Sequence, residues 1–227
     1  MLGSQEFLTA VNLQWGYMTR KPQQRSIETR ARVLKAARDL SRKHGLELVT
    51  AEAVAAEAGV AKGTVFSHYG DMDGLLSHVL LDRLNALRTI SAEDVTPAAG
   101  LEDPVGQLLR NMMAMIDVIT DSPTILRLFL DNIGVTKPNC ATEFVETLDA
   151  LDADLAGFLE LWQSSDAISP ALRRDRTPIE MVDGLIAFMI HGAILLKSHQ
   201  LTDRSVLETR LRRHVEAFVL APVTSTA

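Results

Sequence analysis

Apolar residues recur at intervals of three and four positions along almost the whole chain, and no stretch alternates apolar and polar residues over a useful length. This periodicity is typical of amphipathic helices, which bury one stripe against a core. Near the N-terminus it predicts a helix that Gly45 ends and whose inner face carries Ile27, Ala31, Leu34 and Ala37. The expected fold class is all-α.

Two short helices follow the first one, and residues that favour helix ends mark both of them. Thr50 is a good N-cap for residues 51–58, and Gly59 ends that helix. A second short helix fits residues 61–68. Asp71 can then cap a longer helix that extends to about residue 90.

Helix starts in the second half of the chain repeat one device, in which a capping side chain stands directly before a proline. Three such pairs occur, Asp103-Pro104, Ser122-Pro123 and Thr177-Pro178, and Glu180 completes a capping box with Thr177. We expect further helices from Asn139 to about Trp162 and from Thr202 or Asp203 to about Leu220. The polar, proline-containing residues 89–100 predict a loop before this half.

Charge is distributed unevenly, although the chain as a whole carries a net charge of -6. Residues 18–70 hold ten Lys or Arg against five Asp or Glu, whereas residues 71–227 hold thirteen against twenty-three. A basic segment on an acidic body is expected when one part meets phosphate and the rest does not. An ordinary solvated basic helix gives the same pattern, so charge alone leaves both interpretations open.

Two short helices joined at Gly59-Val60, behind a longer basic helix, have the spacing of a helix-turn-helix. Glycine tolerates a positive φ, which lets the chain turn sharply between the helices. The run TAEAVAAEAGVAKGTVFSHY from Thr50 to Tyr69, with VLKAARDL at 33–40 and Leu75-Leu76, resembles the signature of the TetR/AcrR family of transcriptional regulators. The resemblance covers the N-terminal part of the chain only.

The resemblance implies that residues 61–68 form a recognition helix in the major groove of DNA. Lys62 is then the main candidate to read a base edge, while its neighbours contact bases or phosphate. Aromatic residues such as Phe66 and Tyr69 more often belong to a core than contact DNA, and His68 has a cap or a packing position as its alternative. The expected DNA-binding residues are Thr50, Lys62, Gly63, Thr64, Phe66, Ser67, His68 and Tyr69, with Arg20, Lys21 and Arg25 of the leading arm.

The motif departs from the family pattern at positions that bear on DNA binding. Ala61 replaces the usual Ser or Thr cap, at a cost of about 1 kcal/mol for the helix start. Phe66 replaces a tyrosine and Met72 replaces a lysine that both reach phosphate in the family. Glu52 would add repulsion if its carboxylate faced DNA. These departures predict weaker non-specific binding, which the basic leading arm can offset.

Family resemblance also implies that the helices after residue 100 enclose a pocket for a small effector. The many apolar side chains and methionines permit an adaptable cavity, although plain core packing is the alternative. A hydrophobic effector is expected because no basic cluster suits a phosphate or carboxylate there. The candidate lining residues are Asn111, Met112, Met115, Ile119, Phe129, Asn132, Phe144, Leu148, Phe158, Trp162, Phe188 and His191.

The last two predicted helices are apolar on broad faces, and family members dimerise through helices in this place. Two recognition helices must lie about 34 Å apart to read a palindrome, which favours a homodimer. Burial of the same faces within one chain is the alternative. The expected interface residues are Gly184, Leu185, Ala187, Phe188, Gly192, Leu195, Leu207, Leu211, Val215 and Phe218.

Other features indicate a cytoplasmic protein without a cofactor or a membrane span. A lone Cys140 forms no internal disulfide, and the apolar run 181–196 is interrupted by Asp183 and His191. Residues 1–17 look like a vector-derived or disordered leader. The expected domains are a DNA-binding domain at 18–70 with a linking helix at 72–90, a ligand-binding and dimerisation domain at 71–221, and a disordered tail at 222–227.

Two other classes of function compete with this hypothesis of a ligand-responsive repressor. A helical enzyme is conceivable if the six histidines hid catalytic or metal ligands, but no pair has the HExxH spacing and no GxSxG or phosphate-binding glycine loop occurs. A protein–protein adaptor would instead explain the altered positions Ala61, Phe66 and Met72. Binding to duplex DNA at rising salt separates the adaptor from the repressor.

Overall fold

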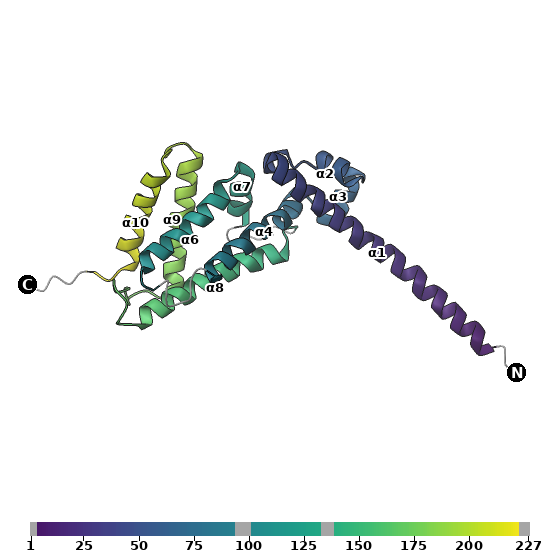
Figure 1. Cartoon of the computed structure of the whole chain (residues 1–227), viewed down its shortest axis with the longest axis horizontal. Coiled ribbons are helices and arrows are strands. Elements are labelled where there is room, and N and C mark those ends of the chain that lie inside the picture. The colour runs from purple at the N-terminus through teal and green to yellow at the C-terminus, as the bar shows by residue number, and fades with distance from the viewer. Residues whose placement is uncertain (1–3, 94–100, 133–138, 223–227) are drawn as a thin grey trace, which may run out of the picture. The chain divides into compact units, whose positions relative to one another are not determined.

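The computed structural model describes the backbone of residues 4–93, 101–132 and 139–222, and the side chains of residues 23–88, 101–131 and 139–222. Helices make up nearly all of this part, so the all-α prediction is confirmed. A single antiparallel bridge joins Leu172 and Leu220 within it. The elements (Figure 1) are α1 (Ser4–His44), η1 (Leu46–Leu48), α2 (Ala51–Ala58), α3 (Lys62–Tyr69), α4 (Met72–Glu93), α6 (Pro104–Thr120), α7 (Pro123–Asn132), α8 (Thr142–Ser164), α9 (Pro178–Lys197) and α10 (Arg204–Val219).

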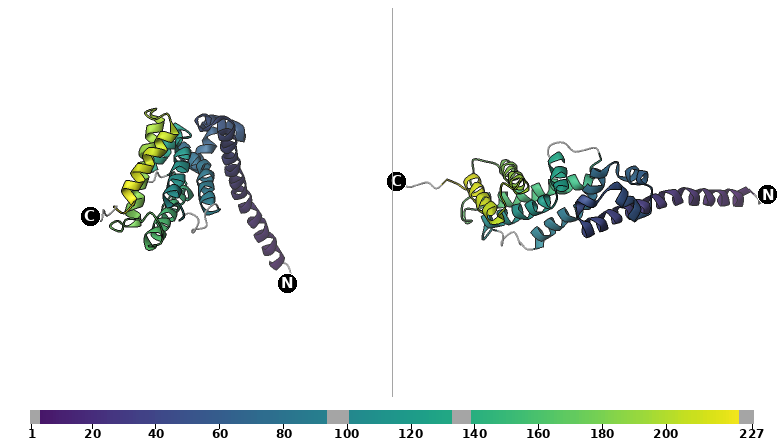
Figure 2. Two further views of the ribbon diagram at one scale, coloured as in Figure 1. Left: turned by 60° about the vertical axis from the view of Figure 1, so that its left-hand side comes forward. Right: turned by 90° about the horizontal axis from the view of Figure 1, so that it is seen from above.

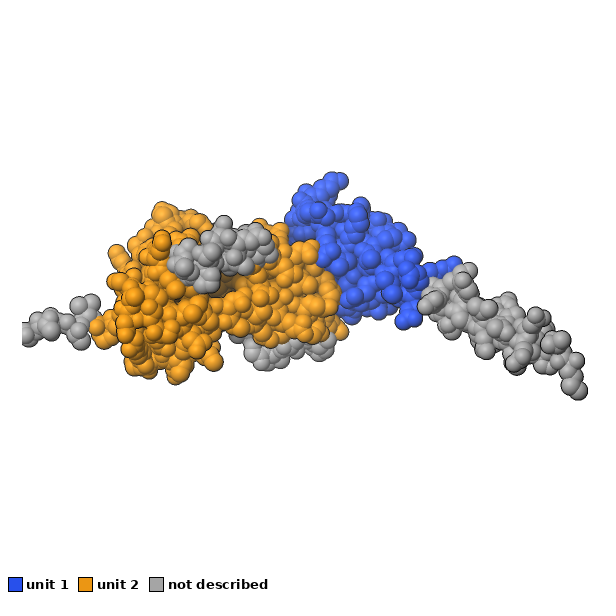
Figure 3. Space-filling model, turned by 60° about the horizontal axis from the view of Figure 1, so that its bottom comes forward, with its two compact units in different colours: residues 1–76 blue, residues 77–227 orange. Residues whose placement is uncertain are grey.

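The chain divides into two compact units, residues 1–76 and residues 77–227 (Figure 3). The division falls inside α4, whose helical backbone is continuous from one unit into the other. The domain limits expected from the sequence remain predictions. Helix α1 begins at Ser4 and so includes backbone that we set aside as a leader, whereas residues 223–227 of the expected tail lie outside the described residues.

Helix ends in the first unit follow the local chemistry that the sequence predicts. The Thr50 hydroxyl accepts a hydrogen bond from the backbone N–H of Ala53 at 3.2 Å and caps α2. Helix α1 ends before Gly45, which has φ 84°. The Asp71 carboxylate accepts from the N–H of Gly74 at 2.8 Å at the start of α4. These end signals are confirmed.

The buried face of α1 overlaps the expected stripe only in part, at Ala37 and at the half-buried Leu34. Val33 and Ala37 are fully buried, and Ala36 and Ser41 nearly so, whereas Ile27 is 59% exposed. Ala31 is exposed as well. Helix α1 packs closely on α2, and small residues allow this close approach, so alanine and serine replace larger side chains at the contact. The apolar spacing of the sequence allowed two adjacent stripes, and the structure buries the one with the smaller residues.

The core of the second unit forms where α6, α8, α9 and α10 pack together (Figure 2). Helices α9 and α10 are antiparallel neighbours, because Gly184 lies against Phe218 and Gly192 lies against Leu207. Apolar side chains from all four helices meet in this core, including Leu108, Ile116, Leu159, Trp162, Met181, Leu185, Leu207, Leu211 and Val215. Burial of this surface is the main stabilising contribution to the unit.

Helix starts in the second unit confirm the proline device but correct one boundary. Asp103 accepts from the N–H of Gly106, and Ser122 accepts from the N–H of Ile125. The capping box of Thr177 and Glu180 is complete. Asn139 does not open α8, because the Ser77 hydroxyl accepts the N–H of Ala141 at 2.8 Å and the helix begins only at Thr142.

Two further boundaries differ slightly from the prediction. Helix α4 continues to Glu93, beyond the expected start of the loop, and the rest of that loop lies outside the described residues. The last helix begins at Arg204 after Asp203, whose carboxylate accepts from the N–H of Ser205 at 2.8 Å. Of the two starts that the sequence allowed, Thr202 and Asp203, the structure uses Asp203 as the cap.

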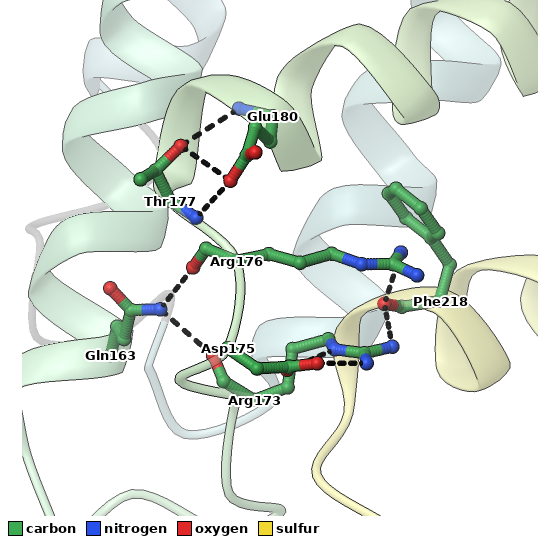
Figure 4. Close-up of polar contacts among 7 residues, drawn as sticks. All are labelled: Gln163, Arg173, Asp175, Arg176, Thr177, Glu180 and Phe218. Atoms are coloured by element: carbon green, nitrogen blue, oxygen red, sulfur yellow. Dashed lines mark hydrogen bonds and ion pairs between the residues drawn. The ribbon is translucent and has the colours of Figure 1, made fainter.

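A strap of residues 170–176 joins the beginning of α9 to the end of α10 (Figure 4). Its backbone pairs with the chain after α10, since the N–H of Arg173 donates to Val219 at 2.9 Å. The side chains of Arg173 and Arg176 both donate to the carbonyl of Phe218, at 3.2 Å and 3.3 Å. Cationic side chains suit the negative end of a helix, so the strap stabilises the C-terminus of α10.

Candidate nucleic-acid interface

The turn between α2 and α3 depends on glycine. Gly59 has φ 63° and ψ 43°, a left-handed conformation that residues with a Cβ adopt at a cost. The N–H of Val60 donates to the carbonyl of Ala55 at 2.9 Å, which closes the helix end in the Schellman manner. This tight closure lets α3 begin only three residues after α2 ends. The helix-turn-helix expected from the sequence is therefore present.

Helix α3 is anchored from behind by two side chains. Val65 is fully buried, and Tyr69 is only 6% exposed. The Tyr69 hydroxyl donates to the carbonyl of Arg30 on α1 at 2.8 Å, and the Arg30 guanidinium lies 5.1 Å from the ring centre. Burial raises the pKa of Tyr69. Tyr69 thus fixes α3 to α1, and its expected role as a DNA contact is corrected to a core role, since its hydroxyl proton is engaged inside the protein.

The opposite side of α3 faces outward at its N-terminal end. Ala61, Lys62, Gly63 and Ser67 are exposed. Ala61 stands at the N-cap without a side-chain hydrogen bond, as the sequence predicts. A Cβ added at Gly63 would meet no atom within 4 Å, so there is open space for a surface to approach the helix backbone. Free N–H groups at such a helix start attract anions.

Lys62 is engaged in a contact that our sequence analysis missed. Its ammonium forms an ion pair with the carboxylate of Glu52 on α2, and it lies 5.9 Å from the centre of the Phe66 ring. Both partners remain largely solvated, with side chains 53% and 66% exposed. The hydrogen bond from Lys62 lowers the pKa of Glu52, so the Glu52 carboxylate stays ionised at neutral pH. The two residues are ten positions apart across the turn, outside the three- and four-residue spacings that flag pairs within one helix.

The remaining residues expected to contact DNA differ in their exposure to solvent. The Ser67 hydroxyl donates to the carbonyl of Thr64 at 2.9 Å, and Thr64, Phe66 and His68 are half-buried. Thr50 is exposed and caps α2, and Arg25 is exposed on α1. The side chains of Arg20 and Lys21 lie outside the described residues.

The predicted effector residues occupy two parts of the second unit. Phe129 and Phe144 meet edge to face with ring centres 5.8 Å apart, where α7 meets α8. Phe158 and Trp162 pack in the core, and the Trp162 indole donates to the carbonyl of Pro170 at 2.8 Å. The packing partners of these aromatic rings, and the hydrogen-bond acceptor of Trp162, are therefore residues of the chain itself. Met112 and Ile119 are buried, whereas Met115, Leu148 and Phe188 are half-buried.

The polar residues among the expected lining residues differ in their burial. Asn111 is half-buried and accepts a hydrogen bond from Gln107 at 3.0 Å. His191 is exposed on α9, so it does not line an enclosed pocket in the single chain. The side chain of Asn132 lies outside the described residues. An open hollow on α10 is lined by Ser205, Val206, Thr209, Arg210, Arg213 and His214, none of which we expected.

Most residues expected at a dimer interface lie inside the single chain instead. Leu185, Gly192, Leu195, Leu207, Leu211 and Val215 are buried. Gly184 and Gly192 admit side chains of the same chain, because a Cβ at Gly184 would lie 2.3 Å from the Phe218 ring and one at Gly192 would lie 3.2 Å from Leu207. Phe188 is half-buried between His214 and Phe218, and of the set only Ala187 is exposed. The buried members of the set belong to the core of the single chain, which corrects their assignment to an interface, whereas Ala187 stays exposed.

Helix α9 nevertheless keeps a second apolar face. Ile179 is 69% exposed and Ile194 is 41% exposed, and Ile186 and Ile190 are half-buried. By length and composition alone this helix is apolar enough to cross a membrane, but a third of it is buried within the chain. A helix that is apolar all round is normally covered on every side. We call Ile179, Ile186, Ala187, Ile190 and Ile194 the outer face of α9.

Comparisons with known proteins agree with this geometry. Residues 33–79 match the family described as "Bacterial regulatory proteins, tetR family". No curated protein matches the chain. In the part of the chain that the structure describes, no three His, Cys, Asp or Glu side chains form a group able to hold a metal ion.

Several solved structures share the fold. A Rhodococcus sp. protein described as a TetR-family transcriptional regulator is 18% identical with TM-score 0.56, over 84% of this chain and 98% of its own. Thermus thermophilus FadR, a TetR-family repressor solved with lauroyl-CoA, is 20% identical with TM-score 0.55, over 87% and 99%. Escherichia coli NemR in its reduced form is 14% identical with TM-score 0.55, over 86% and 100%.

The matched residues include α2, the Gly59 turn and α3, which the geometry identifies as a helix-turn-helix with an outward N-terminal end. The fold of the whole described chain agrees with that of the solved regulators. Residues 33–79 therefore carry the DNA-binding helix-turn-helix of the TetR family of bacterial regulatory proteins, and the described chain shares the fold of solved TetR-family regulators.

Proposed function

We propose that the protein is a repressor that binds a palindromic operator as a homodimer and is released by a small hydrophobic effector. The observation that carries this proposal is the exposed N-terminal end of α3, with Lys62 and Gly63 outward while Val65 and Tyr69 hold the helix from behind. A rigidly held helix with a basic, open end suits insertion into a major groove. Thr50, Ser67 and Arg25 can add phosphate contacts that set the register.

Selection of duplexes from a random pool by the purified protein tests the DNA-binding part. A palindromic consensus is the expected result, and Lys62→Ala should relax one base pair in each half-site at a cost of about 1–3 kcal/mol. An exposed serine substitution, Ser26→Ala on α1, serves as the control. A protein that retains no duplex even at low salt would instead be an adaptor.

The outer face of α9 is the surface that we propose for the second copy. Ile179 and Ile194 are exposed on this face, whereas Ile186 and Ile190 are half-buried and Ile186 packs against the core. An exposed apolar row of this kind is unusual on a monomer. Asp183 and His191 are exposed on the same helix and would have to be buried in lipid if α9 crossed a membrane. An interface between two protein chains in water therefore suits α9 better. A cytoplasmic location follows from this proposal.

Introduction of negative charge on the outer face tests the dimer. Ile190→Glu and Ile194→Glu should convert the protein to a monomer in sedimentation equilibrium and weaken binding to the palindrome. Leu161→Glu is the matched control, because Leu161 is 49% exposed on α8 and lies outside the outer face. A monomeric wild type, or variants that sediment like the wild type, would contradict this interface.

The effector that we propose is hydrophobic and enters the second unit among α6, α7 and α8. The side chains there are apolar, among them Met112, Phe129 and Phe144, and the fold is shared with FadR, which was solved with lauroyl-CoA. Thermal shift with lauryl alcohol, and with acetyl-CoA as a short anionic probe, tests the chemistry. Stabilisation by the alcohol and release of the operator are expected; stabilisation by acetyl-CoA alone would contradict a hydrophobic effector.

The signal would pass through α4, whose helix continues from the reading unit into the effector unit. An effector that prefers one arrangement of the second unit then opposes DNA that prefers another, and the two affinities fall by the same factor. Titration of operator affinity against effector, and of effector affinity against operator, should give that one factor.

A further inference from the structure

The ion pair between Glu52 and Lys62 joins the first turn of α2 to the first turn of α3. It places a carboxylate on the same exposed end of the helix-turn-helix as the lysine that reads DNA in the proposed function. The charge of Glu52 opposes DNA binding, yet its side chain is 66% exposed. A role in packing therefore does not account for this contact.

An ammonium has three N–H donors, and Glu52 occupies at least one of them. The pair as a whole carries no net charge, so it gains little from a phosphate, which would only exchange one anion for another. Guanine differs from phosphate because its N7 and O6 accept two hydrogen bonds in the major groove, and the amino group of the paired cytosine can donate to a carboxylate. The ion pair of Glu52 and Lys62 is thus complementary to a G·C base pair and gains little from the phosphates of the DNA backbone.

We propose that Glu52 is a specificity-determining residue, which withholds Lys62 from phosphate and restricts its use to a G·C base pair. The proposal rests on the proposed DNA-binding function. The ring of Phe66 beneath the ammonium, with its centre 5.9 Å from Nζ, supports the same orientation. Removing the carboxylate would free a lysine for the backbone, so non-specific affinity should rise while discrimination falls.

The test compares Glu52→Gln with Glu57→Gln in the full-length protein. Both substitutions remove one exposed negative charge from α2, but only Glu52 pairs with Lys62. Affinity for a random-sequence duplex is measured at several salt concentrations. If two heads bind, two freed lysines should steepen the salt dependence, so that Glu52→Gln loses about 12-fold more affinity than the wild type between 50 and 200 mM salt. Glu57→Gln should keep the wild-type slope.

Random-pool selection gives the second readout. Glu52→Gln should relax the same base pair that Lys62→Ala relaxes, whereas Glu57→Gln should leave that base pair specified. Circular dichroism melts of all variants verify that each remains folded. Equal slopes and equal specificity for Glu52→Gln and Glu57→Gln would overturn the proposal and leave DNA binding standing. Loss of all duplex binding, in the wild type and in every variant, would overturn both this proposal and the proposed function.

Discussion

Two glycines inside helices of the second unit should respond in opposite ways to the same substitution. Gly157 lies within α8, and a Cβ added there would meet no atom within 4 Å. Alanine is better than glycine in a helix interior by about 1 kcal/mol, so Gly157→Ala should raise the free energy of unfolding by about that amount. Gly184 lies within α9, and the same Cβ would lie 2.3 Å from the ring of Phe218.

The Phe218 ring has little freedom to move away from residue 184. The Arg176 guanidinium lies 4.2 Å from the ring centre on the strap side, and the Phe188 ring meets it edge to face at 5.4 Å. Overpacking of this kind costs about 1–3 kcal/mol. Gly184→Ala should therefore be less stable than Gly157→Ala by about 1–3 kcal/mol, because the gain in helix propensity is common to both.

Urea unfolding followed by the fluorescence of Trp162 measures this difference. Trp162 is buried in the same core, and a Trp15→Phe background removes the other tryptophan of the chain. A second substitution, Phe218→Leu, should restore part of the stability of Gly184→Ala by providing space for the new methyl group. If Gly184→Ala unfolded at the same urea concentration as Gly157→Ala, the close contact between α9 and α10 would be refuted.

Three further predictions concern single groups. Ala61→Ser should stabilise the protein by about 1 kcal/mol by capping α3, and a thermal melt that does not rise would contradict the uncapped start. Tyr69→Phe should cost about 1 kcal/mol in urea unfolding through loss of the bond to Arg30; an unchanged midpoint would show that this bond contributes nothing. Partial desolvation, with Asp149 and Asp183 nearby, raises the pKa of the surface residue Asp152 to about 6 from 3.8, so the folded state binds the extra proton and stability should fall as pH rises from about 4 to 6. Asp183→Asn should lower that pKa in a carboxyl NMR titration, and an unmoved value would exclude the coupling.

Features that depend on local chemistry were predictable from the sequence. Thr50, Gly59 and Asp71 form hydrogen bonds with residues three or four positions away, and each lies at the helix end where we expected it. The start of α8 was not predictable, because it depends on the Ser77 hydroxyl of a distant helix. The face of α9 that packs on α10 was not predictable either. Apolar residues occur on both of its faces, so the sequence pattern does not distinguish them.

The candidate site shows the same limit. Position within the motif identified Lys62 as the outward residue of α3, because neighbouring residues fix the direction of a helix position. Its partner Glu52 was considered only as a source of repulsion, since the contact forms across the Gly59 turn and has no helical spacing. Tyr69 was misassigned for a related reason: the carbonyl of Arg30 that engages its hydroxyl is 39 residues away.

The strap has a consequence for how α9 and α10 can respond to a bound molecule. A short connection joins these helices at residues 198–203, and the strap joins their other ends through Arg173, Arg176 and the backbone of Val219. Two helices that are connected at one end only can change the angle between their axes. Two helices that are connected at both ends move together as a rigid pair. Any rearrangement that reaches this pair must therefore displace it as a whole against α6 and α8, or first detach the two arginines.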